Sequence, residues 1–258
     1  MKSVLPLIIK TQRAAISLHH ASAGNIRKLL NDLSAELLLN TRAILKANAK
    51  DLSKQAADNP KNDRLLLNEV RLKSIAASIR TIAKLPDPSG KMLEKRTLPN
   101  GLKLEKVSVP LGVVGAIYES RPNVTFDISA LCIRSRNACV LKGSGDADQT
   151  NRVSVALIKK VLRRNGINPD VVTLLPPARE VVEELFSASK YIDVLIPRGS
   201  EGLIQYVRKH SQVPVIETGA GVCHVYVETK ADLKKAVSIA VNAKVSRPSV
   251  CNAADAIL

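Results

Sequence analysis

The sequence is poor in aromatic side chains, which make up only 2% of its 258 residues, and it has no tryptophan. Proteins that bind single-stranded nucleic acid stack the bases on aromatic rings, so this sequence offers no such platform. The formal net charge is nevertheless +16, with the basic residues dispersed and one cluster over residues 159–164. We therefore expect a solvated basic surface, with attraction of anionic small molecules as the next alternative and dedicated nucleic-acid binding as the least favoured one.

Motifs for metal binding, export and membrane insertion are also missing. None of the four cysteines and four histidines has the spacing of a CxxC pair or a zinc site. No apolar run approaches the roughly 18 residues that span a bilayer, and the first residues lack the long apolar region of a signal peptide. We expect no metal and no membrane segment. We also expect a cytoplasmic protein in which the thiols stay reduced, namely those of Cys132, Cys139, Cys223 and Cys251.

The period of the apolar residues changes along the chain. Up to about residue 90 they recur at the three- and four-residue spacing of amphipathic helices, one of them expected to begin after an N-cap at Asp63. Residues 102–109 alternate as a half-exposed strand does. From residue 112, apolar strands alternate with helices, which predicts an α/β fold: a Rossmann-like parallel sheet with helices on both faces. We expect strands at 112–118, 138–142, 171–175, 192–196, 214–216 and 222–227, and helices at 124–135, 147–164, 180–187, 201–209 and 232–242.

These patterns divide the chain into three parts. Residues 1–98 form a helical region that packs on the following domain, residues 99–243 form the sheet domain, and residues 244–258 begin a further domain. Ligands of such sheets bind beyond the carboxyl ends of the strands, so the chemistry is expected there.

Eight of the twelve glycines fall in four close pairs, and three pairs begin where an expected strand ends. Glycine lets the backbone approach a ligand closely. Gly143 and Gly199 each precede an expected helix, whose unpaired N–H groups can hold an anion such as a pyrophosphate. Lys142 and Arg198, directly before them, would place cations beside it. Ordinary turn glycines and solvated charges remain equal alternatives on spacing alone.

Three further side chains are candidates for catalysis. Cys251 follows a proline turn and is expected at a helix start, where the helix dipole lowers the thiol pKa and favours a nucleophile; a small buried apolar residue is the alternative. Asn123 could donate to an oxyanion or cap a helix. Glu217, at the end of an expected strand, could be an acid or base or could bond backbone N–H groups.

Three segments carry a specific resemblance. Residues 109–124 (VPLGVVGAIYESRPNV), 217–227 (ETGAGVCHVYV) and 247–253 (RPSVCNA), with LPDP at 85–88 and PNG at 99–101, are similar to the gamma-glutamyl phosphate reductases of the aldehyde dehydrogenase superfamily. The resemblance implies NADPH-dependent reduction of L-glutamate 5-phosphate to L-glutamate 5-semialdehyde, the second step of proline synthesis. It also implies that residues 99–243 bind NADP and that full-length relatives are homo-oligomers.

The resemblance assigns roles to individual residues. Cys251 would attack the acyl phosphate, and hydride from NADPH would reduce the resulting thioester. Asn123 would donate to the oxyanion, and Glu217 matches a glutamate that activates water in hydrolytic relatives. The cofactor would be bound by Ser120, Lys142, Gly143, Arg198, Gly199, Ser200, Thr218 and Gly219.

The sequence departs from the family pattern in two respects. GSGD at 143–146 and Ser200 replace more usual glycine-rich cofactor turns, and the chain stops seven residues after Cys251, where relatives continue. We therefore expect impaired activity from this chain alone. The alternatives are a non-catalytic nucleotide- or nucleic-acid-binding remnant and a relative that oxidises a free aldehyde with Glu217 as base.

Overall fold

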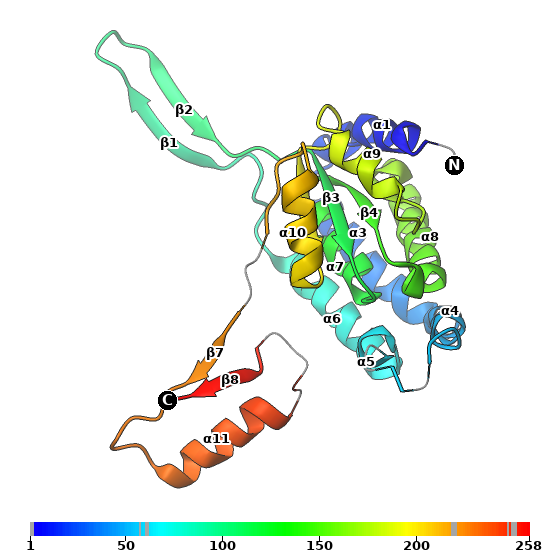
Figure 1. Ribbon diagram of the computed structural model, residues 1–258. Helices are drawn as coiled ribbons and strands as arrows, with labels where there is room; N and C mark the ends of the chain where they lie inside the picture. The colour runs from blue at the N-terminus through cyan, green and yellow to red at the C-terminus, as the bar shows by residue number, and fades with distance from the viewer. Residues whose placement is uncertain (1–2, 57, 60–61, 218–220, 247, 249–251) are drawn as a thin grey trace. The chain divides into compact units, whose positions relative to one another are not determined.

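The computed structural model describes residues 3–56, 58–59, 62–217, 221–246, 248 and 252–258 (Figure 1). The chain forms two compact units, Met1–Glu217 and Thr218–Leu258. The helices of the first unit are α1 (Leu5–Ala14), α2 (Ile16–His19), α3 (Ala23–Leu39), α4 (Thr41–Leu52), α5 (Asn62–Leu65), α6 (Glu69–Lys84), α7 (Asn123–Arg134), η1 (Gly145–Ala147), α8 (Asp148–Arg164), η2 (Pro169–Val171), α9 (Val181–Ser187) and α10 (Glu201–His210). Its strands are β1 (Met92–Thr97), β2 (Lys103–Val107), β3 (Val113–Tyr118), β4 (Ala138–Lys142), β5 (Val172–Leu174) and β6 (Val194–Arg198).

The first unit is built on a parallel sheet in the order β5-β4-β3-β6. All six residues of β3 are buried, as expected of a strand with neighbours on both edges and helices on both faces. In Figure 1, α9 and α10 lie in front of the sheet, and α7, α3 and α6 lie behind it. The structure thus confirms the expected α/β class.

The N-terminal helices form a second layer on the sheet's helices. Buried residues of α3 recur at the expected spacing, and this stripe packs against α6, α7 and α8. Ser22 caps α3 by accepting a hydrogen bond from the backbone N–H of Asn25 (3.1 Å). The expected N-cap at Asp63 is wrong: Asp63 lies within α5, and Asn68 caps α6 by accepting from the N–H of Arg71 (2.8 Å).

The start of α1 is held by a side chain from a distant part of the chain. Glu184 on α9 accepts hydrogen bonds from the backbone N–H groups of Val4 (2.9 Å) and Leu5 (3.3 Å), and from the Ser3 hydroxyl. The Ser3 hydrogen bond is the main cause that lowers the pKa of Glu184. An anionic carboxylate therefore satisfies N–H groups that a helix start otherwise leaves unpaired.

A second long-range connection centres on Arg136, whose φ of 61° places it in the left-handed region. Its guanidinium donates to the carboxylate of Asp87 through Nε (3.1 Å) and Nη2 (2.9 Å). Nη1 also donates to the carbonyl oxygens of Leu18, His19 and Ala21. This one side chain joins the end of α2, the segment after α6 and the turn before β4.

Two strands of the first unit differ from the sequence prediction. The strand expected at 214–216 is reduced to one parallel bridge between Val215 and Leu195, because Pro214 has no N–H to donate to a ladder. β1, which the sequence analysis did not predict, pairs antiparallel with β2. Every residue of β1 is exposed, so this strand has no buried face whose apolar pattern could have revealed it.

The second unit contains β7 (Cys223–Val225), α11 (Leu233–Val245) and β8 (Ala254–Ile257), with β7 and β8 parallel. Asp232 caps α11 by accepting from the N–H groups of Lys234 and Lys235. The helix expected to start at Cys251 is wrong: residues 252–253 form a turn and bend, and β8 follows because it pairs with the open edge of β7. Residues 218–243, expected in the sheet domain, lie in this unit.

None of the helices in the described part of the chain combines the length and the apolar character that a membrane span requires.

We predict that Asp87→Asn lowers the free energy of unfolding by about 2–3 kcal/mol at neutral pH, because it removes the charge facing a half-buried guanidinium. Burial opposes ionisation of Asp87, yet the hydrogen bonds from Arg136 and from the Ser89 N–H outweigh it and lower the pKa of Asp87. A lowered folded-state pKa gives stability that is present above the unfolded value of about 3.9 and is lost as the pH falls through the folded value.

The difference between wild type and Asp87→Asn should therefore shrink below about pH 4. Urea unfolding at a series of pH values measures it, and a difference that stayed constant down to acid pH would contradict this account.

Candidate functional site

The carboxyl edge of the sheet contains a pocket of about 170 Å³ at the point where the winding of the sheet reverses. The chain passes from β3 outward through β4 to β5 and then returns to the other edge of β3 as β6. Ligands of open α/β sheets bind at this kind of reversal. The pocket is lined by residues that follow β3, β4 and β6, together with one arginine of α5: Arg64, Glu119, Ser120, Arg121, Ser144, Asp146 and Gly199.

The turn after β6 binds an anion supplied by the chain itself. Glu119, which follows β3, accepts hydrogen bonds from the backbone N–H of Ser200 (2.9 Å, Oε2) and from its hydroxyl (2.9 Å, Oε1). A Cβ atom on Gly199 would lie 2.7 Å from the Glu119 carboxyl carbon, so glycine is needed for this close approach. The Gly199-Ser200 turn at the start of α10 therefore has the donors and the space for an anionic group.

The helix that follows β4, α8, has a start that is capped by a buried carboxylate from α4. The carboxylate of Asp51, which is fully buried on α4, accepts from the backbone N–H groups of Gln149 (3.1 Å) and Thr150 (2.8 Å) and from the Thr150 hydroxyl (2.7 Å). Gln149 and Thr150 lie at the start of α8. The expectation that the N–H groups at this helix start are available to a pyrophosphate is wrong for these two residues, because both N–H groups already donate to the carboxylate of Asp51.

Gly143 makes room for a close packing contact at the end of β4. A Cβ atom there would lie 2.4 Å from the side-chain nitrogen of Asn151 and 3.3 Å from the ring of Tyr118. Both neighbours belong to a buried chain of hydrogen bonds, in which Thr125 bonds the Tyr118 hydroxyl (2.7 Å) and the Asn151 oxygen (2.8 Å). The glycine lets the end of β4 lie close to α8.

Two other predicted cofactor residues lie at the same edge. Lys142 is buried at the end of β4, and its ammonium donates to the carbonyl oxygen of Pro177 (3.0 Å). Burial, together with the positive charge of Arg179, lowers the pKa of Lys142. The hydroxyl of Ser120 donates to Asp146 (2.5 Å), so a second carboxylate faces the pocket beside Glu119.

Arg198 contributes its backbone to this edge. Its carbonyl oxygen accepts from the N–H of Glu119 (3.2 Å), one residue beyond the β3–β6 ladder. This bond sets the ends of the two strands side by side.

Asn123 is the first residue of α7, and its amide nitrogen donates to the carboxylate of Asp127 one turn later (3.0 Å). The alternative that Asn123 caps the helix is wrong, because Pro122 is the N-cap residue and no side chain caps this end. Burial raises the pKa of Asp127. An asparagine amide has two N–H groups, and Asp127 holds one of them in a fixed orientation.

Glu217 pairs with Arg208 on α10 (Oε1 to Nη1, 3.5 Å). Within the described part of the chain, its Oε2 atom is buried and has no hydrogen-bond partner. Cys251, Thr218 and Gly219 lie outside the described residues, so their predicted roles stay predictions. Among the residues that the structure does describe, no group of three or more histidine, cysteine or acidic side chains could hold a metal ion.

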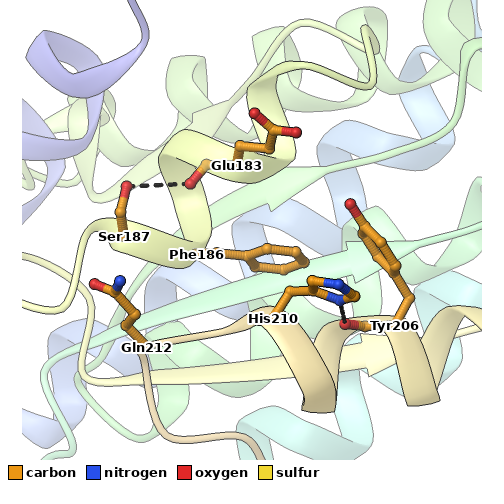
Figure 2. Close-up of a pocket in the computed structure, with 6 residues that line it drawn as sticks. All are labelled: Glu183, Phe186, Ser187, Tyr206, His210 and Gln212. Atoms are coloured by element: carbon orange, nitrogen blue, oxygen red, sulfur yellow. Dashed lines mark hydrogen bonds between the residues drawn. The ribbon is translucent and has the colours of Figure 1, made fainter.

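A second pocket, of about 240 Å³, lies between α9 and α10 (Figure 2). Its base is a row of rings: Phe186 and Tyr206 are 5.7 Å apart between centroids, and Tyr206 and His210 are 4.3 Å apart. His210 donates from Nδ1 to the carbonyl oxygen of Tyr206 (2.8 Å), since a carbonyl can only accept. This pocket shares no lining residue with the pocket at the strand ends.

The sequence analysis missed two acidic residues that line the pocket, Glu119 and Asp146, and a third, Asp51, that caps the helix after β4. Glu119 was visible as a charged residue directly after a buried strand, a position that favours function. Asp146 follows the glycine turn and could have been suspected in the same way. Asp51 had no signal, because its partner helix begins about a hundred residues later.

Comparison with known proteins gives a consistent picture. The aldehyde dehydrogenase family model matches residues 10–258. Gamma-glutamyl phosphate reductase of Chlorobium phaeobacteroides is 55% identical over 249 residues, which are 96% of this chain and 60% of the relative. The same enzyme of Bacteroides thetaiotaomicron is 49% identical over 244 residues, covering 95% and 58%. The chain thus spans about 60% of the length of these curated relatives.

Solved structures agree with these matches. The crystal structure of gamma-glutamyl phosphate reductase from Thermotoga maritima has a TM-score of 0.90 at 35% identity and covers 99% of this chain and 63% of that one. The Saccharomyces cerevisiae structure has a TM-score of 0.76 at 30% identity and covers 95% and 64%. These likenesses confirm the resemblance drawn from residues 109–124, 217–227 and 247–253.

We predict that Asp51→Ala lowers the free energy of unfolding by about 2–4 kcal/mol, because it removes a cap and leaves buried donors unpaired. Asp148→Ala at the first residue of α8 is the matched control. Its carboxylate pairs with the exposed Arg152 (2.8 Å), so its loss should cost less than about 1 kcal/mol. Equal losses in urea unfolding would contradict the capping role of Asp51.

We also predict that Gly143→Ala destabilises the protein by about 1–3 kcal/mol, since the added methyl group overpacks the contact with Asn151 and Tyr118. Gly202→Ala is the control: Gly202 lies in α10, and no atom other than the neighbouring backbone of its own helix lies within 4 Å of the added carbon. Alanine there should raise stability by up to about 1 kcal/mol. Thermal melting of both variants measures the contrast, and a neutral Gly143→Ala would refute the packing argument.

Proposed function

Because this chain belongs to the aldehyde dehydrogenase family, we propose that it is the cofactor-binding part of a gamma-glutamyl phosphate reductase, with NADP as its dinucleotide. The reaction would convert L-glutamate 5-phosphate into L-glutamate 5-semialdehyde. The observation that carries the proposal is the Gly199-Ser200 turn at the reversal point of the sheet. There the backbone N–H and the hydroxyl of Ser200 donate to an anionic group, the carboxylate of Glu119.

The residues at this edge fit a dinucleotide. A carboxylate of the chain already bonds the Ser200 donors, so the turn accepts a negatively charged oxygen pair of the kind that a phosphate presents. Lys142, at the end of β4 on the other side of β3, adds a buried cation at the same edge of the sheet. When bound, NADPH would supply the hydride that the reduction needs.

The proposed chemistry at the reacting carbon belongs to side chains of this chain. The Cys251 thiolate would attack the acyl carbon of glutamate 5-phosphate, form a thioester and release inorganic phosphate. The Asn123 amide, oriented by Asp127, would donate to the oxygen that becomes negative during this attack. Reduction to an aldehyde needs no activated water, so Glu217 has no step of its own in this direction.

The proposal also includes the cellular compartment, the oligomeric state and the cofactor preference of the enzyme. Cys132 and Cys139 are unpaired thiols in the described chain, which suits a reducing compartment such as the cytoplasm. Homo-oligomerisation, as implied for full-length relatives, and discrimination against NAD belong to the proposal as well.

We predict that Cys251→Ser lowers the rate of NADPH consumption with glutamate 5-phosphate by about a thousandfold or more, since a serine hydroxyl is a far poorer nucleophile. Cys132→Ala is the matched control. A hydrogen bond that the Cys132 thiol donates to Cys139, together with burial, raises the pKa of Cys132, so this thiol stays protonated and unreactive. Its loss should leave the rate nearly unchanged.

Several outcomes would count against the proposal. Turnover that survives Cys251→Ser would exclude the nucleophile, and a carboxylate product would favour oxidation of a free aldehyde instead. Titrations with NADPH and with duplex DNA at about 0.15 M salt separate the remaining alternative. Salt-sensitive DNA binding without NADPH binding would refute the enzyme and favour a nucleic-acid-binding module.

A further inference from the structure

Glu119 occupies an unusual position for an acidic residue. It follows β3 at the reversal point, and its backbone N–H donates to Arg198 at the end of β6. Its side chain extends to the turn after β6, where its two carboxylate oxygens accept hydrogen bonds from the backbone N–H and the hydroxyl of Ser200. An acidic side chain thus lies in the crevice where sheets of this class bind their ligands.

The carboxylate takes over the bonds that would otherwise belong to the helix cap. Ser200 is the N-cap residue of α10, and an N-cap serine ordinarily accepts from an N–H of its own helix. Here it makes no such capping bond, and its hydroxyl donates to Glu119 instead. The first turn of α10 therefore faces a negative charge from another strand rather than its own cap.

Gly199, which precedes Ser200, leaves room for the Glu119 carboxylate. The carboxyl carbon, one oxygen and the γ-carbon of Glu119 all lie within 3 Å of the position of a Cβ atom on Gly199, at 2.7, 2.8 and 2.9 Å. The space above this glycine is filled by the carboxylate. A phosphate group on the Ser200 donors would need the same space and would carry the same sign of charge.

We infer that Glu119 is an internal substitute for a cofactor phosphate: it occupies the Ser200 anion site when no dinucleotide is bound, and it must leave when one binds. The inference rests on the proposed function for the identity of the dinucleotide. Glu119 is only half-buried and borders the 170 Å³ pocket, so its carboxylate can turn into solvent without disturbing the core.

This arrangement has a measurable consequence for affinity. When the binding-competent form is only part of the population, the apparent dissociation constant rises by the inverse of that fraction. Glu119→Gln and Glu119→Ala should therefore bind NADPH about three- to tenfold more tightly than the wild-type 258-residue chain. Isothermal titration calorimetry measures this without any turnover.

Glu201→Gln is the matched control. Glu201 is an exposed acidic residue in the first turn of the same helix, so the substitution changes the net charge equally without emptying the crevice. Its NADPH affinity should stay within about twofold of wild type. Equal tightening in Glu201→Gln and Glu119→Gln would overturn the inference, since net charge alone would then explain the effect. Weaker binding by the Glu119 variants would also overturn it, because Glu119 would then hold the cofactor directly.

A second readout follows the Ser200 amide proton by hydrogen exchange. It should be protected in the free wild-type chain, exposed in free Glu119→Ala, and protected again when NADPH is added to that variant. Exchange that is equally slow in free wild type and free Glu119→Ala would show that Glu119 does not occupy the site.

Inorganic pyrophosphate serves as the probe that is independent of cofactor identity. If no form of the protein binds NADPH or NADP⁺, the proposed function fails. Tighter pyrophosphate binding by Glu119→Ala than by wild type and Glu201→Gln would still support the substitute anion. Absence of that difference would refute it.

Discussion

The candidate site depends on the parallel pairing of β3 with β4 on one edge and with β6 on the other. The register sets Ile117 opposite Lys142 and Tyr118 opposite Arg198. The next residue of each strand therefore emerges at the same level, so the Glu119 side chain meets the turn after β6 and Ser120 meets the turn after β4. A shift of one residue in either ladder would turn these side chains toward the opposite face.

The starts of α8 and α10 lie at the same edge of the sheet and treat negative charge in different ways. At α8 the anion is Asp51, a fully buried carboxylate with three hydrogen bonds, so it is a permanent part of the fold. At α10 the anion is Glu119, which is half exposed and bonded to one residue. The two helix starts carry the same positive partial charge. Because Asp51 is fully buried and Glu119 is not, only the carboxylate at α10 can be replaced by a ligand.

Much of this organisation was predictable from the sequence, because local patterns encode it. The alternation of apolar strands and helices after residue 112 predicted the parallel sheet, and the strand at 138–142 was placed residue for residue. Contacts between distant segments could not be predicted: Asp51 and Glu119 find their partners only in the folded chain. β8 was not predicted because Asn252 and the small residues around it suit a helix start, whereas residues 254–257 become a strand by pairing with β7, a contact between distant segments.

The capping of α1 by Glu184 has a consequence for how the chain is made. The carboxylate that binds the N–H groups of Val4 and Leu5 lies about 180 residues later in the sequence. At ribosomal rates of about 5–20 residues per second, α1 leaves the ribosome about 10–40 s before its cap exists. During synthesis the N–H groups at the start of α1 must therefore wait for α9, which follows β5, before they meet the carboxylate that caps them, although α1 is made first.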